Sequence, residues 1–199
     1  MQLLSVNLGK AINIAGVDRT VISGIGKRAV AGAQALRRTG LVGDEQADLT
    51  VHGGQDKALY AYPHEHYAVW ARMRAQALRL PQQVMQDSAL DFGLFGENLT
   101  LSGVLENELW VGDQLRFPNC VLVVSQPRIP CFKFNIAMGF AHAAKMMVQS
   151  ATCGFYLSVL DGDSIEAKQT FSLKAGPREI SIPELFEART RKARQQNLF

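Results

Sequence analysis

The sequence predicts a mainly β protein, with a β-barrel-like core and several peripheral α-helices. Three observations support this fold class: short strand-like runs recur along the chain, turn residues separate them, and few stretches have helical character. No internal repeat, low-complexity segment or linker divides the chain. We therefore expect a single domain over residues 1–199, with a short C-terminal helical tail from about residue 181.

Short runs of apolar and β-branched residues mark the expected strands. They cover residues 3–7, 11–17, 21–22, 109–111, 114–117, 120–125, 154–160, 164–168 and 169–173. Segments 114–117 and 120–125 flank Pro118 and Asn119, which can turn the chain. These two segments are therefore expected to pair as a β-hairpin.

Helical character is confined to three stretches. Residues 64–80 lie between two prolines and carry apolar side chains at roughly helical spacing. Residues 136–149 are rich in alanine, methionine and histidine and form the second candidate. Ser181 and Glu184 have the spacing of a capping box, which predicts the start of a third helix before a basic tail.

The composition sets limits on function. Lysine and arginine total 21 against 18 acidic residues, and this net charge of +3 is too small to indicate a nucleic acid polymer as partner. The N-terminus lacks the features of a signal peptide, and no apolar run reaches the length of a membrane span. Three widely spaced cysteines favour neither a disulfide framework nor a zinc site, and Cys120 and Cys153 have the surroundings of core or edge residues. We expect a cytoplasmic protein.

The clearest sign of chemistry is the segment 125–131, which ends in Cys131. Two prolines stiffen this segment and keep it out of a helix. Arg128 and Lys133 lie close by in the sequence, and cationic neighbours favour thiolate over thiol. A rigidly held thiolate suits a nucleophile or a ligand to a soft metal. A buried structural cysteine is the alternative interpretation, and this segment alone does not decide between them.

Other polar residues stand beside glycines, as they do in ligand-binding loops. Lys27 and Arg28 follow such a turn and have the charge to hold a phosphate, although a solvated basic turn is the alternative. His52 precedes two glycines whose backbone amides can approach a ligand, and a structural histidine is its alternative. Asn98 offers donor and acceptor edges to a heterocycle such as a pterin or purine, or else stabilises a turn.

The acidic cluster of residues 44–48 does not have the spacing of an EF-hand. We interpret its carboxylates as turn residues and salt-bridge partners rather than as ligands to calcium or magnesium.

Taken together, these segments resemble the MOSC family, in its stand-alone, YiiM-like bacterial branch. The matching motifs are GDEQAD (43–48), VHGGQDK (51–57), AYP with EHY (61–67), FGENL (95–99), VGD (111–113) and SQPRIPC (125–131). They occur in the order and spacing of the family and cover most of residues 20–160. The resemblance implies a single MOSC domain with a β-barrel fold.

The resemblance also implies that the chain binds molybdenum cofactor, a pterin (molybdopterin) whose dithiolene holds the metal and which usually carries an anionic phosphate tail. Cys131 matches the family position that ligates molybdenum and is therefore the expected catalytic residue. Lys27 and Arg28 match the basic pair that meets the anionic end of the cofactor. The full set of expected cofactor-binding residues is Lys27, Arg28, His52, Gln55, Asp56, Lys57, Gly96, Glu97, Asn98, Ser125, Arg128, Lys133 and Asn135.

The implied activity is the reduction of N-hydroxylated compounds to amines, including N-hydroxylated purine base analogues such as 6-hydroxylaminopurine. The sequence shows no flavin, haem or iron–sulfur motif, so the resemblance implies a separate electron-donor protein, and pyridoxal phosphate is not expected. Longer relatives carry a helical C-terminal extension. If that extension shapes the active site or docks the electron donor, we expect this chain to depend on a homodimer partner or another subunit. The alternative function is a non-catalytic module that carries the cofactor, or a sulfur atom as a persulfide on Cys131.

Overall fold

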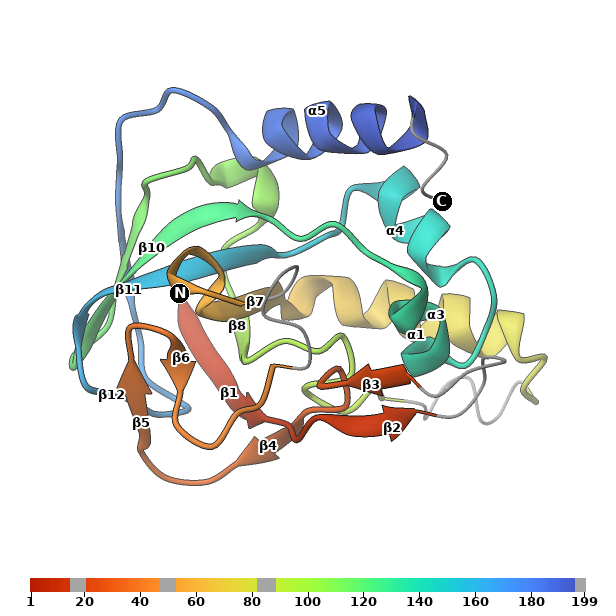
Figure 1. Ribbon diagram of the computed structural model, residues 1–199, viewed down its shortest axis with the longest axis horizontal. Coiled ribbons are helices and arrows are strands. Elements are labelled where there is room, and N and C mark those ends of the chain that lie inside the picture. The colour runs from red at the N-terminus through yellow and green to blue at the C-terminus, as the bar shows by residue number, and fades with distance from the viewer. Residues whose placement is uncertain (15–20, 47–52, 82–88, 196–199) are drawn as a thin grey trace.

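The computed structural model describes residues 1–14, 21–46, 53–81 and 89–195. Within these residues, eight strands form one large sheet in the order β13-β9-β10-β11-β7-β8-β1-β4 (Figure 1). Their bounds are β1 Gln2–Leu8, β4 Arg28–Val30, β7 Leu59–Pro63, β8 Leu99–Ser102, β9 Gln114–Arg116, β10 Cys120–Pro127, β11 Phe155–Gly162 and β13 Ser172–Lys174. Neighbouring strands are antiparallel except for β7 and β8, which are parallel, so the sheet is mixed.

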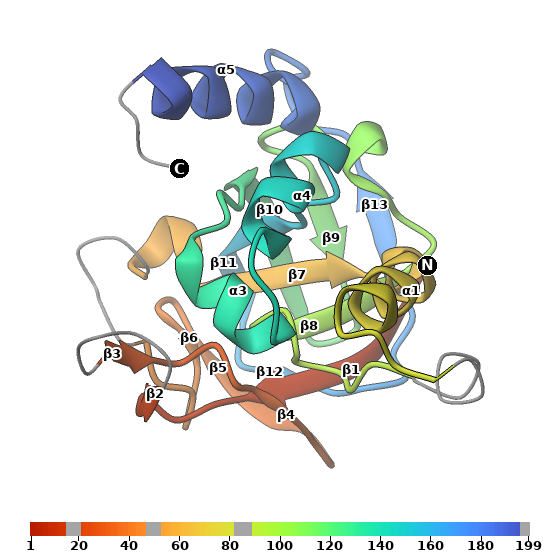
Figure 2. The same ribbon diagram turned by 90° about the vertical axis from the view of Figure 1, so that its right-hand side faces the viewer.

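Two smaller sheets accompany it. One contains β5 Gln34–Arg37, β6 Gly40–Leu41 and β12 Ser164–Ile165, and the other is a hairpin of β2 Ile12–Ile14 with β3 Val21–Ser23. The hairpin lies at the bottom of both views, at the end of the molecule opposite α5 Ile182–Gln195 (Figures 1 and 2).

The large sheet curls without closing into the barrel that the sequence predicted. The backbone of Leu3 accepts from Lys168 at 2.7 Å and donates to Gln169 at 2.9 Å, which brings the segment before β13 against the start of β1. Among the described residues, however, no ladder joins the edge strands β13 and β4. Both strands are three residues long, and β4 pairs only with the far end of β1. The β-dominated prediction is confirmed, whereas the closed barrel is wrong.

Strand β7 separates two hydrophobic cores. Leu59 and Ala61 face a core that is largely aliphatic, whereas Tyr60 and Tyr62 face a second core rich in aromatic residues. Because successive side chains of a strand point to opposite faces, a strand with a core on each side is buried along its whole length. All five residues of β7 are buried for this reason.

The aromatic core fills the space between the sheet and three helices, α1 Tyr67–Ala77, α3 Phe132–Met138 and α4 Ala143–Ser150. Figure 2 shows these helices together in front of the sheet, with α5 above them. The ring of Phe95 stacks on Tyr62 at 4.1 Å between centroids, and Trp70 meets Phe134 edge to face at 5.3 Å. Within the described part of the chain, no helix is long and apolar enough to cross a membrane.

The helix predictions are confirmed in part. The capping box at α5 is present, because Ser181 donates to the Glu184 carboxylate at 2.6 Å and accepts from its backbone at 3.3 Å. The predicted helix 64–80 is a short 3-10 turn, His64–His66, followed by α1. The single helix predicted over 136–149 is wrong: Gly139, at a left-handed φ of 76°, ends α3 and separates it from α4.

The strand predictions divide in a similar way. The hairpin of 114–117 with 120–125 is confirmed as β9 paired with β10. The strands β4 to β8 had not been predicted, and four of these five are four residues or shorter.

Leu122 on β10 provides a test of the aliphatic core. Its side chain is fully buried, so Leu122→Ala should lower the free energy of unfolding by about 3 kcal/mol through lost burial and a residual cavity. Leu160 on the adjacent strand β11 is 48% exposed. Leu160→Ala should therefore change the free energy of unfolding by no more than about 0.5 kcal/mol. Urea unfolding of both variants measures the difference, and equal losses would contradict this placement of the core.

Candidate functional site

A pocket lies where loops from several parts of the chain meet beside the aromatic core. Its cavity volume is about 100 Å³. Its wall is made by Ser23, Gly24, Ile25, Lys27, Asp44, Glu45, Gln46, Gly53, Lys57, Tyr60, Phe95, Gly96, Asn98, Arg128, Cys131, Lys133 and Tyr156.

The pocket brings together about half of the residues that were predicted from the sequence to bind the cofactor or its metal. Those that line it are Lys27, Lys57, Gly96, Asn98, Arg128, Cys131 and Lys133. Those outside its wall are Arg28, Gln55, Asp56, Glu97, Ser125 and Asn135. His52 lies outside the described residues.

Cys131 stands at the junction of loop 128–131 and α3. The loop follows β10 without regular structure, as its prolines predicted, and Cys131 itself is extended, with φ −132° and ψ 176°. Its side chain is half-buried in the pocket wall. The other two cysteines differ, because both are packed in hydrophobic cores, as predicted. Burial raises the pKa of Cys120 to about 12 and also raises the pKa of Cys153.

Arg128 places a buried positive charge beside Cys131. The residue is 6% exposed, and its guanidinium carbon lies 5.0 Å from the ring centre of Tyr60 and 5.2 Å from that of Phe134. No ion pair to Arg128 exists among the described residues, and one guanidinium nitrogen contacts the sulfur of Met147 at 3.7 Å. Since a buried cation without a counter-ion is costly, this group favours an anion in the pocket.

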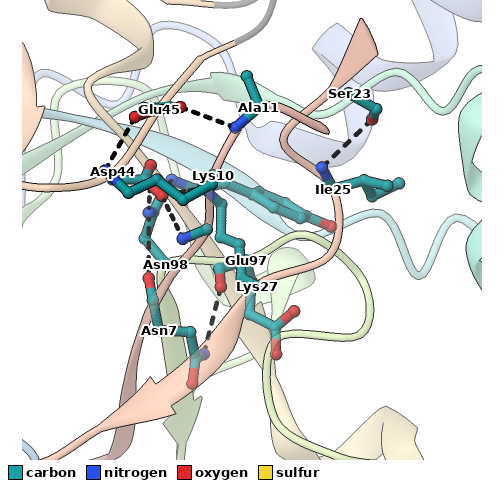
Figure 3. Close-up of polar contacts among 12 residues, drawn as sticks. Asn7, Lys10, Ala11, Ser23, Ile25, Lys27, Asp44, Glu45, Glu97 and Asn98 are labelled. Carbon is teal, nitrogen blue, oxygen red and sulfur yellow. Dashed lines mark hydrogen bonds and ion pairs between the residues drawn. The ribbon is translucent and has the colours of Figure 1, made fainter. Parts of the chain in front are cut away.

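Lys27 is also buried, but its charge is compensated. Its side chain is 7% exposed and forms an ion pair with Asp44, which is 4% exposed. Asp44 also accepts hydrogen bonds from the backbone of Gly9 at 2.8 Å and from the Asn98 side chain at 2.9 Å. Figure 3 shows the Asp44 carboxylate between Asn98 and Lys27. Burial lowers the pKa of Lys27, and the attraction of Asp44 opposes this shift without cancelling it.

Asn98 uses most of its side chain to hold the protein together. Its oxygen accepts from the backbone of Tyr60 at 3.1 Å, and its nitrogen donates to Asp44 and, at 3.3 Å, to the backbone of Asn7. Both N–H groups are therefore engaged, and one lone pair of the oxygen is left for a ligand. This arrangement favours a positioning role over direct recognition of a heterocycle.

Glu97 acts behind the pocket wall. One carboxylate oxygen accepts from the backbone of Gly93 at 2.7 Å, from Thr100 at 3.0 Å and from the Tyr67 hydroxyl. The other oxygen has no hydrogen-bond partner among the described residues. Gly93 has a φ of 91°, and a Cβ there would meet the Lys27 carbonyl oxygen at 2.5 Å. Glu97 thus holds the loop that packs directly on the backbone of Lys27.

The remaining nominated residues lie at the surface or have structural contacts. Arg28 is exposed on β4, and Gln55 is exposed in the 3-10 turn Gln55–Lys57. Ser125 donates to the backbone oxygen of Asp56. Asn135 accepts from the backbone at the first turn of α4, at 2.8 Å. Their predicted role in cofactor binding stays a prediction.

The sequence-based set lacked several contributors to the pocket, among them Asp44, Tyr60 and Tyr156. Asp44 had been interpreted as a salt-bridge partner, which is confirmed, but its place in the pocket wall was not foreseen. Tyr60 and Tyr156 lie opposite each other on paired strands β7 and β11. No single-sequence signal identifies such a pair, because it depends on which strands pair and in what register.

The polar groups of the site do not form a conventional metal cluster. Among the described residues, no group of three or more His, Cys, Asp and Glu side chains is arranged to hold a metal ion. A single half-buried thiol suits a metal that brings its other ligands with it.

The family model of the MOSC domain matches residues 48–172. The chain belongs to the MOSC domain family. It is similar to Protein YiiM of Escherichia coli (strain K12), with 36% identity over 162 residues, which cover 81% of this chain and 68% of that protein.

Two further comparisons extend this finding. A protein named Reductase from Gibberella moniliformis is 31% identical over 176 residues, which are 88% of this chain but 29% of that protein. The crystal structure of YiiM from Geobacillus stearothermophilus superposes with a TM-score of 0.71 at 29% identity, covering 96% of this chain and 84% of the other. The MOSC fold is therefore shared along nearly the whole chain.

Asp44→Asn tests the buried ion pair. The substitution leaves the Lys27 ammonium buried without its counter-ion, so we expect the free energy of unfolding to fall by about 3 kcal/mol. The adjacent Glu45→Gln is the matched control, because its ion pair with Lys10 is exposed and should leave stability unchanged within error. Urea unfolding at neutral pH compares the two variants. If both lose the same stability, the pair in the pocket is no stronger than the surface pair.

Glu97 should make stability depend on pH. Burial raises its pKa, so the folded chain holds this proton more tightly than the unfolded chain does. The resulting stabilisation is complete below the unfolded pKa and is lost as the pH rises through the folded pKa. Glu97→Gln should remove this decline, measured by urea unfolding across a pH series.

Glu184 should make stability depend on pH in the opposite direction. Hydrogen bonds from Ser181 lower the pKa of Glu184, so its contribution is lost as the pH falls, and Glu184→Gln should remove that loss. If the free energy of unfolding still declines with rising pH in Glu97→Gln, the decline does not come from Glu97.

Proposed function

We propose that this MOSC protein binds molybdenum cofactor and reduces N-hydroxylated compounds to amines, with Cys131 as the protein ligand to molybdenum. One observation carries the proposal: the half-buried Cys131 thiol lines the same pocket as the buried guanidinium of Arg128, which has no ion pair among the described residues. A thiolate is a soft ligand that suits such a metal, and a guanidinium suits an anionic oxygen.

The described wall of the pocket fits part of the cofactor. Tyr60 and Tyr156 provide aromatic surface for a planar ring, while Arg128 and Lys133 provide positive charge for an anionic tail. The cavity of about 100 Å³ is smaller than a complete molybdopterin, so these residues would enclose only a portion of it.

The mechanism assigns a distinct task to each residue. When bound, the cofactor supplies two-electron redox chemistry at molybdenum. Cys131 would hold the metal and tune it through the thiolate, and Arg128 would bind an anionic group beside it. Tyr60 and Tyr156 would hold the planar ring of the cofactor by stacking. The overall reaction converts R–NHOH, two electrons and two protons into R–NH₂ and water.

The comparisons support a reductase without identifying its substrate. The relative from Gibberella moniliformis is named Reductase, and this chain corresponds to 29% of it. We propose 6-hydroxylaminopurine and related N-hydroxylated bases as the substrate class, a separate electron-donor protein as the source of electrons, and the cytoplasm as the compartment.

Cys131→Ala tests the proposal. Protein made in a host that synthesises molybdenum cofactor should carry molybdenum, and the variant should lose at least about tenfold of its molybdenum content, because the protein ligand is gone. Turnover of 6-hydroxylaminopurine with a chemical reductant should fall with it. Cys120→Ala, in the aliphatic core, is the matched control and should keep both.

The outcomes separate the candidate functions. Normal metal content and full turnover in Cys131→Ala would overturn the ligand assignment. Stable molybdenum loading of the wild type without reduction of any N-hydroxylated substrate would favour a carrier of cofactor or sulfur instead.

A further inference from the structure

Lys27 differs from the other cations of the pocket. Its ammonium is buried and already neutralised by Asp44, so it contributes little net charge to anchor an anion. It nevertheless lines the same pocket as Cys131. A buried lysine that is paired, faces a reaction site and is held in one position is suited to transferring a proton.

We propose that Lys27 donates a proton to the oxygen that leaves the substrate, and that Asp44 positions Lys27 for this step. The inference rests on the proposed function. The reduction breaks one N–O bond and consumes two electrons, which the electron-donor protein supplies, and two protons. One proton passes from the Lys27 ammonium to the departing hydroxyl, which leaves as water. The second comes from solvent to the nitrogen, and solvent then reprotonates the Lys27 amine.

The other ionisable groups that face Lys27 or share the pocket are less suited to this step. Arg128 does not release a proton in proteins, and Cys131 is committed to the metal. Burial raises the pKa of Tyr60 and of Tyr156, which makes both hydroxyls weaker acids. Glu45 is exposed and paired with Lys10. Among the described residues, three further ionisable groups lie nearby. Glu97 acts behind the wall, Lys57 lies 5.9 Å from the Tyr156 ring, and Lys133 donates to the backbone of Ile22 at 2.9 Å.

The surroundings of Asp44 explain how the donor is held. The carboxylate receives hydrogen bonds from Lys27 and from Asn98, which precedes β8 (Figure 3). It also receives one from the backbone of Gly9, which follows β1. These contacts fix its two oxygens against two strands of the large sheet. A carboxylate fixed in this way sets the position of the ammonium and favours its charged form, whereas burial makes the proton easier to release.

Two substitutions separate a proton donor from a fixed charge. Lys27→Arg keeps the positive charge but cannot release a proton, and Lys27→Met removes both. We expect each variant to lose about 100-fold in turnover of 6-hydroxylaminopurine per molybdenum bound. Lys10→Met removes a lysine that is also paired with a carboxylate, but outside the pocket wall, and should keep full turnover.

The pH profile gives a second readout. Wild-type turnover should fall as the pH rises through the pKa of Lys27, because the donor loses its proton. In Asp44→Asn this fall in turnover should occur at lower pH, since the carboxylate that favours the ammonium is gone. In Lys27→Arg the residual turnover should not show this fall.

A third readout needs neither cofactor nor turnover. NMR titration of protein labelled at the lysine ε-carbon, with Lys27→Met to assign the signal, should show Lys27 titrating below an ordinary lysine and lower still in Asp44→Asn. An ordinary titration, or full turnover in Lys27→Arg, would overturn the inference. Its failure is distinct from failure of the proposed function, in which the wild type itself would carry no molybdenum or reduce no substrate.

Discussion

A buried carboxylate and a buried amide hold the pocket of this protein together. Asp44 and Asn98 bond to each other and to backbone groups of Gly9, Tyr60 and Asn7. These contacts join the end of β1, the strand β7 and the start of β8. Inside a protein, a polar network is stable only when its members satisfy one another. The position of the ammonium in the pocket and the integrity of the sheet beside it therefore depend on the same few hydrogen bonds.

The two cores give this network a rigid frame. Strand β7 contributes alternate side chains to an aliphatic core on one side and an aromatic core on the other. The aromatic core also receives Phe95 from the loop before β8 and Phe134 from α3. The loops that form the pocket are consequently anchored at their ends by packed rings, so the site belongs to the core rather than to a detached surface region.

Local signals in the sequence predicted the features that depend on neighbouring residues. The capping box at Ser181, the β9–β10 hairpin and the irregular loop before Cys131 all follow from residues a few positions apart. The break at Gly139 was missed, since an isolated glycine inside an apolar periodic stretch does not by itself end a helix. The closed barrel failed because closure depends on edge strands too short to be recognised.

The residues of the site divide in the same way, into those that sequence motifs predicted and those that depend on contacts between distant parts of the chain. Family motifs nominated Cys131, Arg128 and Lys27, which the fold brings into one pocket. The pairing of Lys27 with Asp44 and the meeting of Tyr60 with Tyr156 join residues distant in sequence, and only the strand register determines them. The same resemblance also predicted that Asn135 and Ser125 bind the cofactor. In the structure their side chains form hydrogen bonds with backbone groups of the protein.

Phe134 has a consequence for how such a site can change over evolution. The same ring lies under the Arg128 guanidinium and anchors the helix that begins next to Cys131. A change of volume beneath this ring would displace the sulfur atom and the positive charge at once. Descendants of this chain are thus free to vary the rim of the pocket, but a change at the end that holds Cys131 and Arg128 would require coordinated repacking of the interior.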